Sequence, residues 1–232
     1  MKTSETGTLY VVATPIGNLE DITYRAVRIL GEAELVLCED TRTSKTLLKQ
    51  YGINTKTSSY HAHSNAHKHD SIVALLLEGK SIALISDAGT PGISDPGSLL
   101  ISAIREEHPD IPVIPVPGAN AIGALVSVSG FTGNEFTFLG FVPHKKGRET
   151  FFTSLSEYEH PVVFYESCHR ILKTLDALVR YQNTHLLFIG REMTKKFETY
   201  LYGDIELVRS KVGENSNTQK GEFSVMLIPR KK

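Results

Sequence analysis

The sequence is poor in sulfur and contains no tryptophan: among 232 residues there are two cysteines, Cys38 and Cys168. Both lie within or beside mostly apolar runs, which favours buried thiols in a reducing compartment over a disulfide. No apolar run approaches the roughly 20 residues that a membrane span needs. The polar segment 1–7 lacks the apolar stretch of a secretory signal. We therefore expect a cytoplasmic protein without a membrane partner.

An excess of charge of either sign is also missing. The chain has 25 Lys and Arg residues against 26 Asp and Glu residues, a formal net charge of -1. Any contact with RNA must therefore come from local basic patches. With 41% hydrophobic and 22% charged residues, the composition is that of a globular protein with a core.

The order of apolar runs predicts the fold class. In the first half, continuous apolar strands alternate with helical stretches, as in a mainly parallel sheet covered on both faces. Strands of the second half are more aromatic and alternate, which indicates a mixed sheet. Segment 130–134, with two Gly and one Asn, marks the boundary. We therefore predict two α/β domains, residues 1–130 and 131–232.

The expected strands share short apolar runs and are 9–13, 35–38, 82–85, 113–116, 136–139, 162–165, 186–189, 197–202 and 223–228. The expected helices share helical spacing of apolar residues and are 22–30, 43–51, 71–77, 96–107, 119–129, 147–158, 169–181 and 204–211.

Three turns rich in small residues, 13–19, 86–97 and 117–121, follow predicted strands of the first half. In a parallel sheet, ligands bind beyond the carboxyl ends of the strands, where these turns would meet. Each turn leaves backbone amides uncovered for a ligand. A tight connection that happens to use Gly and Pro is the competing interpretation for any one turn. Together they predict one ligand site.

Two fingerprints of phosphate-bearing ligands are absent. The chain has no Gly-x-Gly-x-x-Gly segment and no phosphate loop ending in Gly-Lys-Ser or Gly-Lys-Thr. A ligand with little or no phosphate is therefore preferred over NAD or ATP. S-adenosylmethionine (SAM) fits, because an acidic group such as Asp87 can face its cationic part while open amides hold its carboxylate.

The same turns belong to a longer series of motifs, which are 13–23, 39–42, 86–97, 164–170, 191–195 and 220–223. In this order the series resembles the small-subunit ribosomal RNA methyltransferases among the tetrapyrrole methylase-like SAM enzymes. The Asp-Ala-Gly-Thr-Pro block at 87–91 is very specific. The resemblance implies SAM bound in a cleft between two α/β domains, and a homodimer. It also implies methyl transfer to the 2′-oxygen of a cytidine in the decoding region of 16S ribosomal RNA, either as naked RNA or in the small ribosomal subunit.

The resemblance also implies which residues bind the cofactor. They belong to the three turns and to the strand 162–165, whose Tyr165 is expected to close over the ligand. The cofactor-binding residues are Pro15, Ile16, Gly17, Asp87, Ala88, Gly89, Thr90, Asn120, Ala121 and Tyr165.

The sequence departs from the family pattern at several positions. Ala62 stands where a His-Glu-His-Asn motif has Glu, Asn120 where Ser is frequent, and Cys168 where Pro is usual. Many family members continue into a small helical domain, whereas this sequence stops at Lys232. We therefore expect the grip on RNA to depend on the two α/β domains and a second subunit.

Methyl transfer to a ribose hydroxyl needs close, collinear reacting atoms and a base that removes or orients the proton. The residues weighed as base are Glu39, Asp40, Glu166, Glu192, Lys195, His61 and His63. For each of them a salt bridge or helix cap is the competing interpretation, and Lys195 fits either a neutral base or a phosphate contact. The first choices as catalytic residues lie at predicted strand ends inside the matched motifs and are Asp40, Arg42, Glu166 and Lys195.

The sequence also holds crowded histidines and two basic clusters. His61, His63, His67 and His69 do not have the spacing of a zinc site, so no metal is expected. The basic clusters follow the predicted strands at 136–141 and 186–190, where they can position phosphates without reading bases. A solvated loop is the alternative for each. The predicted RNA-binding residues are Lys145, Lys146, Arg148, Arg191 and Lys196.

Two rival functions stay open. One is a related SAM enzyme that acts on a tetrapyrrole or a protein side chain, although those relatives usually carry a Gly-Asp-Pro type turn in place of the 87–91 block. The other is a SAM-binding or RNA-binding ribosome assembly factor without catalysis, which the replacement at Ala62 leaves open.

Charge reversal of Lys145 and Lys146 to Glu should weaken RNA binding and leave SAM affinity intact, because the contacts of these lysines to phosphate are electrostatic and neither lysine belongs to the three turns. Filter binding with RNA and calorimetry with SAM measure the two affinities. Equal loss of both would point to misfolding and contradict the assignment.

Overall fold

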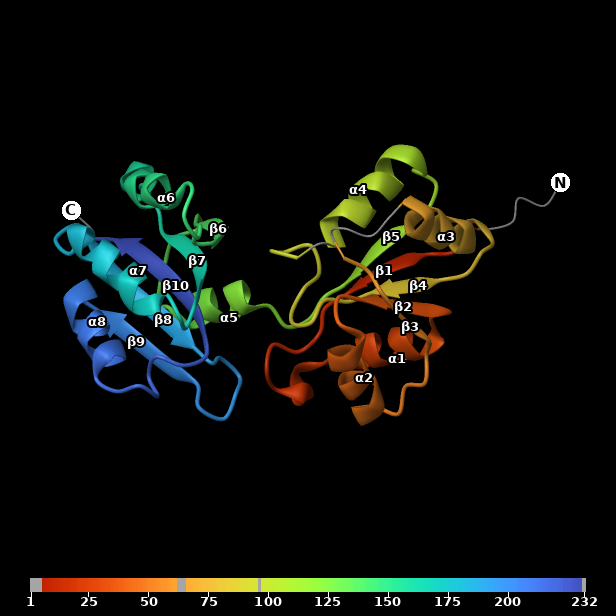
Figure 1. Cartoon of the computed structure of the whole chain (residues 1–232), viewed down its shortest axis with the longest axis horizontal. Coiled ribbons are helices and arrows are strands. Elements are labelled where there is room, and N and C mark those ends of the chain that lie inside the picture. Colours follow the sequence, from red (N-terminus) through yellow and green to blue (C-terminus); the bar gives the residue numbers. More distant parts are fainter. Residues whose placement is uncertain (1–5, 62–65, 96, 231–232) are drawn as a thin grey trace. The chain divides into compact units, whose positions relative to one another are not determined.

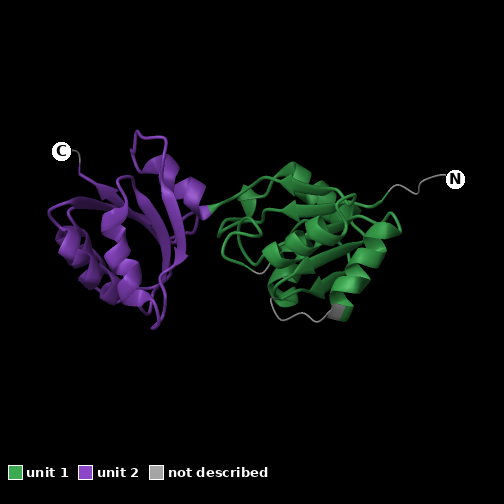
Figure 2. Ribbon diagram, turned by 90° about the horizontal axis from the view of Figure 1, so that it is seen from above, with its two compact units in different colours: residues 1–120 green, residues 121–232 purple. Residues whose placement is uncertain are grey.

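The computed structural model describes residues 6–61, 66–95 and 97–230. It divides into two compact units, Met1–Asn120 and Ala121–Lys232 (Figure 2). The division lies ten residues before the boundary expected at 130. Helix α5, Ala121–Val128, accounts for the difference, because it packs against strand β10, Glu222–Pro229, of the second unit.

The first unit contains one parallel sheet in the order β3-β2-β4-β1-β5. Its strands are short, and the three central ones are mostly buried, as expected for a sheet covered on both faces. They are β1 Leu9–Val12, β2 Leu35–Cys38, β3 Thr57–Ser59, β4 Ile82–Leu84 and β5 Val113–Val116.

Four helices cover the two faces of this sheet (Figure 1). One face packs α1 and α2 against alternate strand residues such as Val36 and Ala83, and the other packs α3 and α4 against residues such as Leu37 and Leu84. The helices are α1 Tyr24–Glu32, α2 Thr41–Gln50, α3 Ala66–Leu77 and α4 Gly97–Glu107. A short 3-10 helix, Leu19–Asp21, precedes α1.

Local chemistry explains why α1 forms. The Thr23 hydroxyl accepts a hydrogen bond from the Ala26 amide, which caps the helix. Ala26, Ile29 and Leu30 recur at helical spacing and are buried in the core. The capped start and the apolar stripe together turn the chain back over the sheet immediately after the loop that follows β1.

The neighbouring strands β1 and β4 create a topological switch point. From β1 the chain passes to α1 on one face, whereas from β4 it passes to α4 on the opposite face. The two loops therefore part beyond the carboxyl ends of adjacent strands, which is where parallel α/β sheets bind ligands.

The second unit contains a mixed sheet in the order β6-β7-β10-β8-β9. Strands β6 and β7 are parallel, while β10 is antiparallel to both β7 and β8. Strands β6, β7 and β8 therefore run in one direction and end at one edge. The strands not yet given bounds are β6 Thr137–Phe141, β7 Val162–Ser167, β8 His185–Arg191 and β9 Thr199–Gly203.

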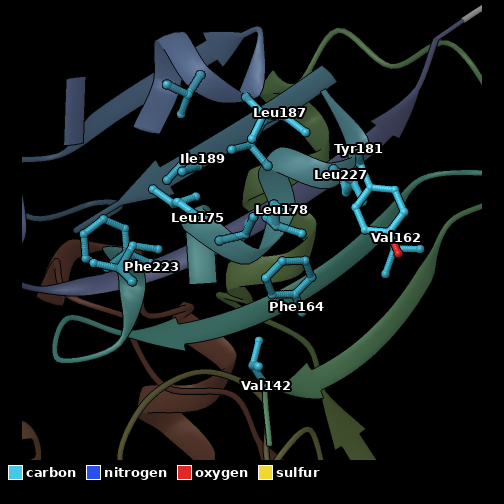
Figure 3. Close-up of a cluster of buried hydrophobic side chains, with 14 of the residues drawn as sticks. Val142, Val162, Phe164, Leu175, Leu178, Tyr181, Leu187, Ile189, Phe223 and Leu227 are labelled. Carbon is cyan, nitrogen blue, oxygen red and sulfur yellow. The ribbon is translucent and has the colours of Figure 1, made fainter. Parts of the chain in front are cut away.

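Three helices and two 3-10 turns cover one face of the second sheet. In Figure 3, the side chains of Phe164, Leu187 and Leu227 project from the strands toward Leu175 and Leu178. Each of these residues is at most 1% exposed. The covering elements are α6 Arg148–Ser154, the 3-10 helix Leu155–Glu157, α7 Ile171–Leu178, the 3-10 helix Val179–Tyr181 and α8 Ile205–Gly213.

Helix α5 covers the opposite face of the second sheet. Side chains alternate along β8, so Gly190 faces away from the core that holds Leu187 and Ile189. A Cβ on Gly190 would lie 2.9 Å from the Leu125 Cδ1 atom of α5. A residue without a side chain therefore lets this helix approach the strand closely.

The predicted fold class is confirmed: both units are α/β, the first sheet is parallel and the second mixed. Strand β3 was missed, because Thr57, Ser58 and Ser59 carry no apolar side chain to signal a strand at the sheet edge. Helix α3 begins at Ala66, five residues before its apolar spacing starts. Within the described part of the chain, no helix has the length and apolar character of a membrane span.

Candidate functional site

The turns after β1 and β4 are joined by a two-residue antiparallel bridge. The Thr14 amide donates to the Gly89 carbonyl at 2.9 Å, and the Gly89 amide donates to the Thr14 carbonyl at 3.0 Å. The Thr14 hydroxyl, also buried, donates to the Ser86 carbonyl at 3.2 Å. Two of the three turns predicted to meet therefore do so through their backbones.

The third turn packs against the other two. The Thr90 hydroxyl donates to the Ala119 carbonyl at 3.3 Å, and the Asn120 amide donates to the Thr90 hydroxyl at 3.4 Å. A Cβ on Gly118 would lie 3.1 Å from the Cβ of Ala13. All three turns thus meet at the carboxyl edge of the first sheet. Every residue that makes these contacts lies between positions 13 and 120, in the first unit.

Gly89 lies where the turns converge. Its φ of +79° is a left-handed conformation that side chains rarely adopt, and an added Cβ would lie 3.3 Å from the Ile16 Cγ2 atom. Gly17, Asp87 and Ala88 are exposed around it, while Pro15 is buried. The joined turns thus form a cradle of main chain, in which a Cβ at Gly89 would press on Ile16.

An acidic cluster borders the cradle. The Asp87 carboxylate accepts a hydrogen bond from the Asp40 amide at 3.0 Å, which ties the end of β2 to the turn after β4. Burial, followed by the nearby carboxylates of Asp87 and Asp95, raises the pKa of Glu39. The raised pKa moves Glu39 toward the range that a general base needs at neutral pH.

Asp40 and Arg42, two of the four predicted catalytic residues, form an ion pair. The Arg42 guanidinium lies 2.7 Å from an Asp40 oxygen, and the Arg42 amide donates to the same carboxylate at 2.8 Å. These hydrogen bonds lower the pKa of Asp40 to about 2. Asp40 caps α2, and its low pKa makes it a weak proton acceptor.

Glu166, the third predicted catalytic residue, is buried in the second unit. Its side chain is 0% exposed and lies 2.7 Å from the Arg170 guanidinium and 3.5 Å from that of Arg148. The Thr174 hydroxyl donates to it at 2.6 Å and the Ser167 amide at 2.7 Å. This environment favours the salt-bridge interpretation over catalysis, since the carboxylate is fully engaged and closed to substrate.

Lys195, the fourth, bridges two carboxylates. Its ammonium lies 2.8 Å from Glu192 and 2.9 Å from Glu222. Burial lowers the pKa of Lys195, but hydrogen bonds to the two carboxylates outweigh it, and the pKa is raised. Lys195 therefore keeps its proton at neutral pH, which opposes the neutral-base hypothesis.

The predicted RNA-binding residues separate into two groups. Lys145 and Lys146 are exposed in the loop that follows β6. Arg148 turns inward instead: it donates to the Thr174 hydroxyl at 2.8 Å and lies 5.0 Å from the centroid of the Phe152 ring. Arg191, at the end of β8, donates to three backbone carbonyls and serves the fold.

Tyr165, predicted to close over the cofactor, belongs to strand β7 of the second unit. The rings of Phe138 and Phe141 lie 5.0 and 5.2 Å from its own. Burial raises its pKa to about 12, so the phenol stays protonated. Ala121 also belongs to the second unit, as the first residue of α5.

Histidines do not assemble a metal site in the described ranges. His63 lies outside them, as does Ala62, while His61, His67 and His69 lie inside. Within residues 6–61, 66–95 and 97–230, no group of three or more His, Cys, Asp or Glu side chains is arranged to hold a metal ion.

The sequence did not single out Thr14 or Asp95 as individual site residues. The Asp95 carboxylate accepts from the Gly92 and Gly97 amides at 2.8 Å, which shapes the turn and starts α4. An Asp shortly before a helix is an ordinary capping signal, so its position was readable. Nothing in sequence marks Thr14 as the bridge residue, since that role depends on the pairing of separate turns.

Solved structures show the same fold. The methyltransferase CobJ superposes with a TM-score of 0.69 at 16% identity, covering 98% of this chain and 97% of the other. A uroporphyrin-III C-methyltransferase from Thermus thermophilus, in complex with S-adenyl homocysteine, gives a TM-score of 0.62 at 17% identity over 95% and 97%. These likenesses show the fold. The model of the Tetrapyrrole (Corrin/Porphyrin) Methylases matches residues 8–208, and the chain therefore belongs to the tetrapyrrole methylase class.

Closer relatives narrow the class. Proteins named Ribosomal RNA small subunit methyltransferase I share 44% identity in Halalkalibacterium halodurans, covering 95% of this chain and 75% of the relative, and 42% in Neisseria meningitidis, covering 96% and 76%. The relative of that name in Leptospira biflexa is 43% identical over 98% and 93%. The chain belongs to the ribosomal RNA small subunit methyltransferase I family.

Replacing Glu166 by Ala should lower the free energy of unfolding by about 3–5 kcal/mol, because Arg148 and Arg170 lose their buried partner. Glu149→Ala is the matched control: it breaks an exposed pair with Arg180 and should cost about 0–1 kcal/mol. Chemical denaturation followed by circular dichroism measures both. Similar losses in the two variants would contradict a buried structural role.

Gly89→Ala should raise the Kd for SAM about tenfold or more, because the added Cβ crowds Ile16 and fills the cradle. Gly92→Ala is the control, since Gly92 has a comparable φ of +87° but nothing within 4 Å of its Cβ position. Both variants carry similar backbone strain. Calorimetric titration that finds equal Kd values for the two would place the ligand elsewhere.

Proposed function

We propose that this chain is a SAM-dependent methyltransferase of small-subunit ribosomal RNA that methylates the 2′-oxygen of a cytidine in the decoding region. Three relatives at 42–44% identity carry the name Ribosomal RNA small subunit methyltransferase I. The single observation that carries the proposal is that this likeness extends over at least 95% of the chain and includes the turns that meet at Gly89.

The cradle suits SAM by its shape and charge. With no side chain at Gly89, whose Cβ would crowd Ile16, a ligand can lie against the main chain of the joined turns. Exposed Asp87 offers a carboxylate for a cationic ligand, and the turns offer amides for a carboxylate. We assign the cofactor to the turns of the first unit, at residues 15–17, 87–90 and Asn120, while Ala121 and Tyr165, which belong to the second unit, stay expectations from the family resemblance.

When bound, SAM supplies the methyl group on a positively charged sulfur. The residues of this chain have two tasks: to hold the ribose oxygen in line with that methyl carbon, and to take up the hydroxyl proton. Arg42, whose side chain is 90% exposed and paired with Asp40, is placed to orient the RNA strand. Glu39, with its raised pKa, is the better proton acceptor of the two adjacent carboxylates.

RNA binding falls to the exposed basic residues. Lys145, Lys146 and Lys196 are the cations of the two clusters that the fold leaves at the surface, whereas Arg148 and Arg191 are engaged internally. With a net charge of -1, the chain needs a structured substrate on which many contacts share the work. We therefore propose the small ribosomal subunit as substrate, a homodimer as the active form, and the cytoplasm as the location.

Purified protein incubated with labelled SAM and small subunits from a strain that lacks this gene should place label on a cytidine ribose, which mass spectrometry of nuclease fragments can map. In the same assay Glu39→Gln should lower kcat by about 10²- to 10⁴-fold if Glu39 takes the proton. Asp40→Asn should lower kcat far less, because the carboxyl of Asp40 has a pKa of about 2 and is a weak proton acceptor.

The rivals give different results. Label on a tetrapyrrole or protein side chain, and none on RNA, would support the first rival. Tight SAM binding without transfer to any of these would support an assembly factor. Equal rates for Glu39→Gln and the unmodified protein would remove Glu39 as the base and leave the ribose methylation itself intact.

A further inference from the structure

Among the described residues, Phe197 is the most exposed phenylalanine. It lies in the loop between β8 and β9 and is 68% exposed. Burying such a ring would contribute favourable free energy to binding, so an exposed ring on a fixed loop is available to a ligand. The surrounding contacts hold this loop, and with it the Phe197 backbone, in place.

Arg191 holds the loop in place through hydrogen bonds to the backbone. Its guanidinium donates to the carbonyls of Lys220 at 2.6 Å, Asn217 at 2.7 Å and Phe197 itself at 3.1 Å. The backbone of the ring-bearing residue is thereby tied to the loop that leads into β10. Arg191 thus fixes the place from which the Phe197 ring projects.

The rest of the loop is held in a strained conformation. Glu192 and Thr194 have left-handed φ values of 51° and 66°. The Glu192 carboxylate accepts from the Glu222 amide at 3.0 Å, while Glu198 accepts from the Thr194 amide at 2.7 Å. Strain of this kind persists where surrounding contacts fix the backbone, and it is concentrated at functional sites.

A cation lies over the exposed ring. The Lys196 ammonium is 5.5 Å from the centroid of Phe197. Within the described ranges Lys196 has no ion pair, whereas Lys195 neutralises Glu192 and Glu222. An aromatic face with an adjacent cation matches a nucleotide, whose base stacks on the ring while its phosphate meets the charge.

Sheet topology brings the other exposed cations to the same edge. Strands β6 and β8 run in the same direction, so the loop with Lys145 and Lys146 and the loop with Lys196 both lie beyond their carboxyl ends. Three strand spacings separate them, about 14 Å. A single strand of nucleic acid can cross both loops.

We propose that Phe197 is a stacking platform for an unpaired base of the RNA substrate, with Lys196 facing the adjacent phosphate. This rests on the proposed function and adds a contact to a base, whereas the basic clusters alone contact only phosphate. Sequence-specific recognition of RNA relies on such splayed bases stacked on aromatic side chains. A contact between two copies of this chain is the competing use of the ring.

Phe197→Ala should raise the KM for small subunits by about 5- to 150-fold and leave the KM for SAM unchanged, since each stacked base contributes binding of that order. Phe197→Trp should restore the parental KM. Phe197→Leu, which is apolar but not planar, should behave like Phe197→Ala. Phe136→Ala is the matched control. Phe136 is 41% exposed and directly precedes the first residue of β6, at the sheet edge opposite to the two basic loops.

Three further measurements decide the interpretation. The melting temperature of each variant should equal that of the parent, as expected for an exposed side chain. Sedimentation should show the same mass for Phe197→Ala and the parent; a lower mass that Phe197→Leu restores would overturn the proposal in favour of an interface between copies. An unchanged KM for small subunits in Phe197→Ala would overturn the stacking platform, and methyl transfer by the parent protein would be unaffected by that result.

Binding of a fluorescent RNA hairpin with an unpaired loop separates this inference from the proposed function. A Phe197-dependent Kd for the hairpin supports the platform even if the parent protein transfers no methyl group. A Kd that is equal in the parent, Phe197→Ala and Phe197→Trp contradicts the platform even if methyl transfer to RNA is observed.

Discussion

The first unit depends on the backbone bridge between Thr14 and Gly89. It joins the loops after β1 and β4 at the point where the chain parts toward opposite faces of the sheet. The third turn then closes against the pair through Thr90 and the Ala119 carbonyl. Without this bridge the loops would be independent connections; with it they form one surface, on which Asp87 also holds the end of β2.

In the second unit, a buried carboxylate has the comparable role. Glu166 on β7 forms ion pairs with Arg148 of α6 and with Arg170 at the start of α7, and it accepts a hydrogen bond from the Thr174 hydroxyl. The motif in which it lies had favoured a catalytic residue, yet a charge enclosed by two guanidinium groups is better explained as a structural junction. Motif membership and chemical participation are thus different properties, and the surroundings of the side chain distinguish them.

Much of the fold was predictable from sequence because apolar runs and caps are local signals. The strands at Leu35–Cys38 and Ile82–Leu84 and the Thr23 cap of α1 were readable in this way. Strand β3 was not, since three hydroxyl residues carry no apolar pattern. The turns of the site were predictable as a group. The opposite pKa shifts of Glu39 and Asp40 were not, because a pKa depends on neighbours such as Asp87 that come from distant segments.

The cradle at Gly89 consists largely of main chain, and Ile16 lies so close to Gly89 that an added Cβ would press on it. An alanine scan of the usual kind would pass over it, since truncating side chains removes little from a surface built of peptide groups. Substitution of the exposed side chain of Ala88 would likewise change this surface less than a single methyl group added at Gly89. The tolerance of the joined turns to mutation therefore runs opposite to that of a surface made from functional side chains.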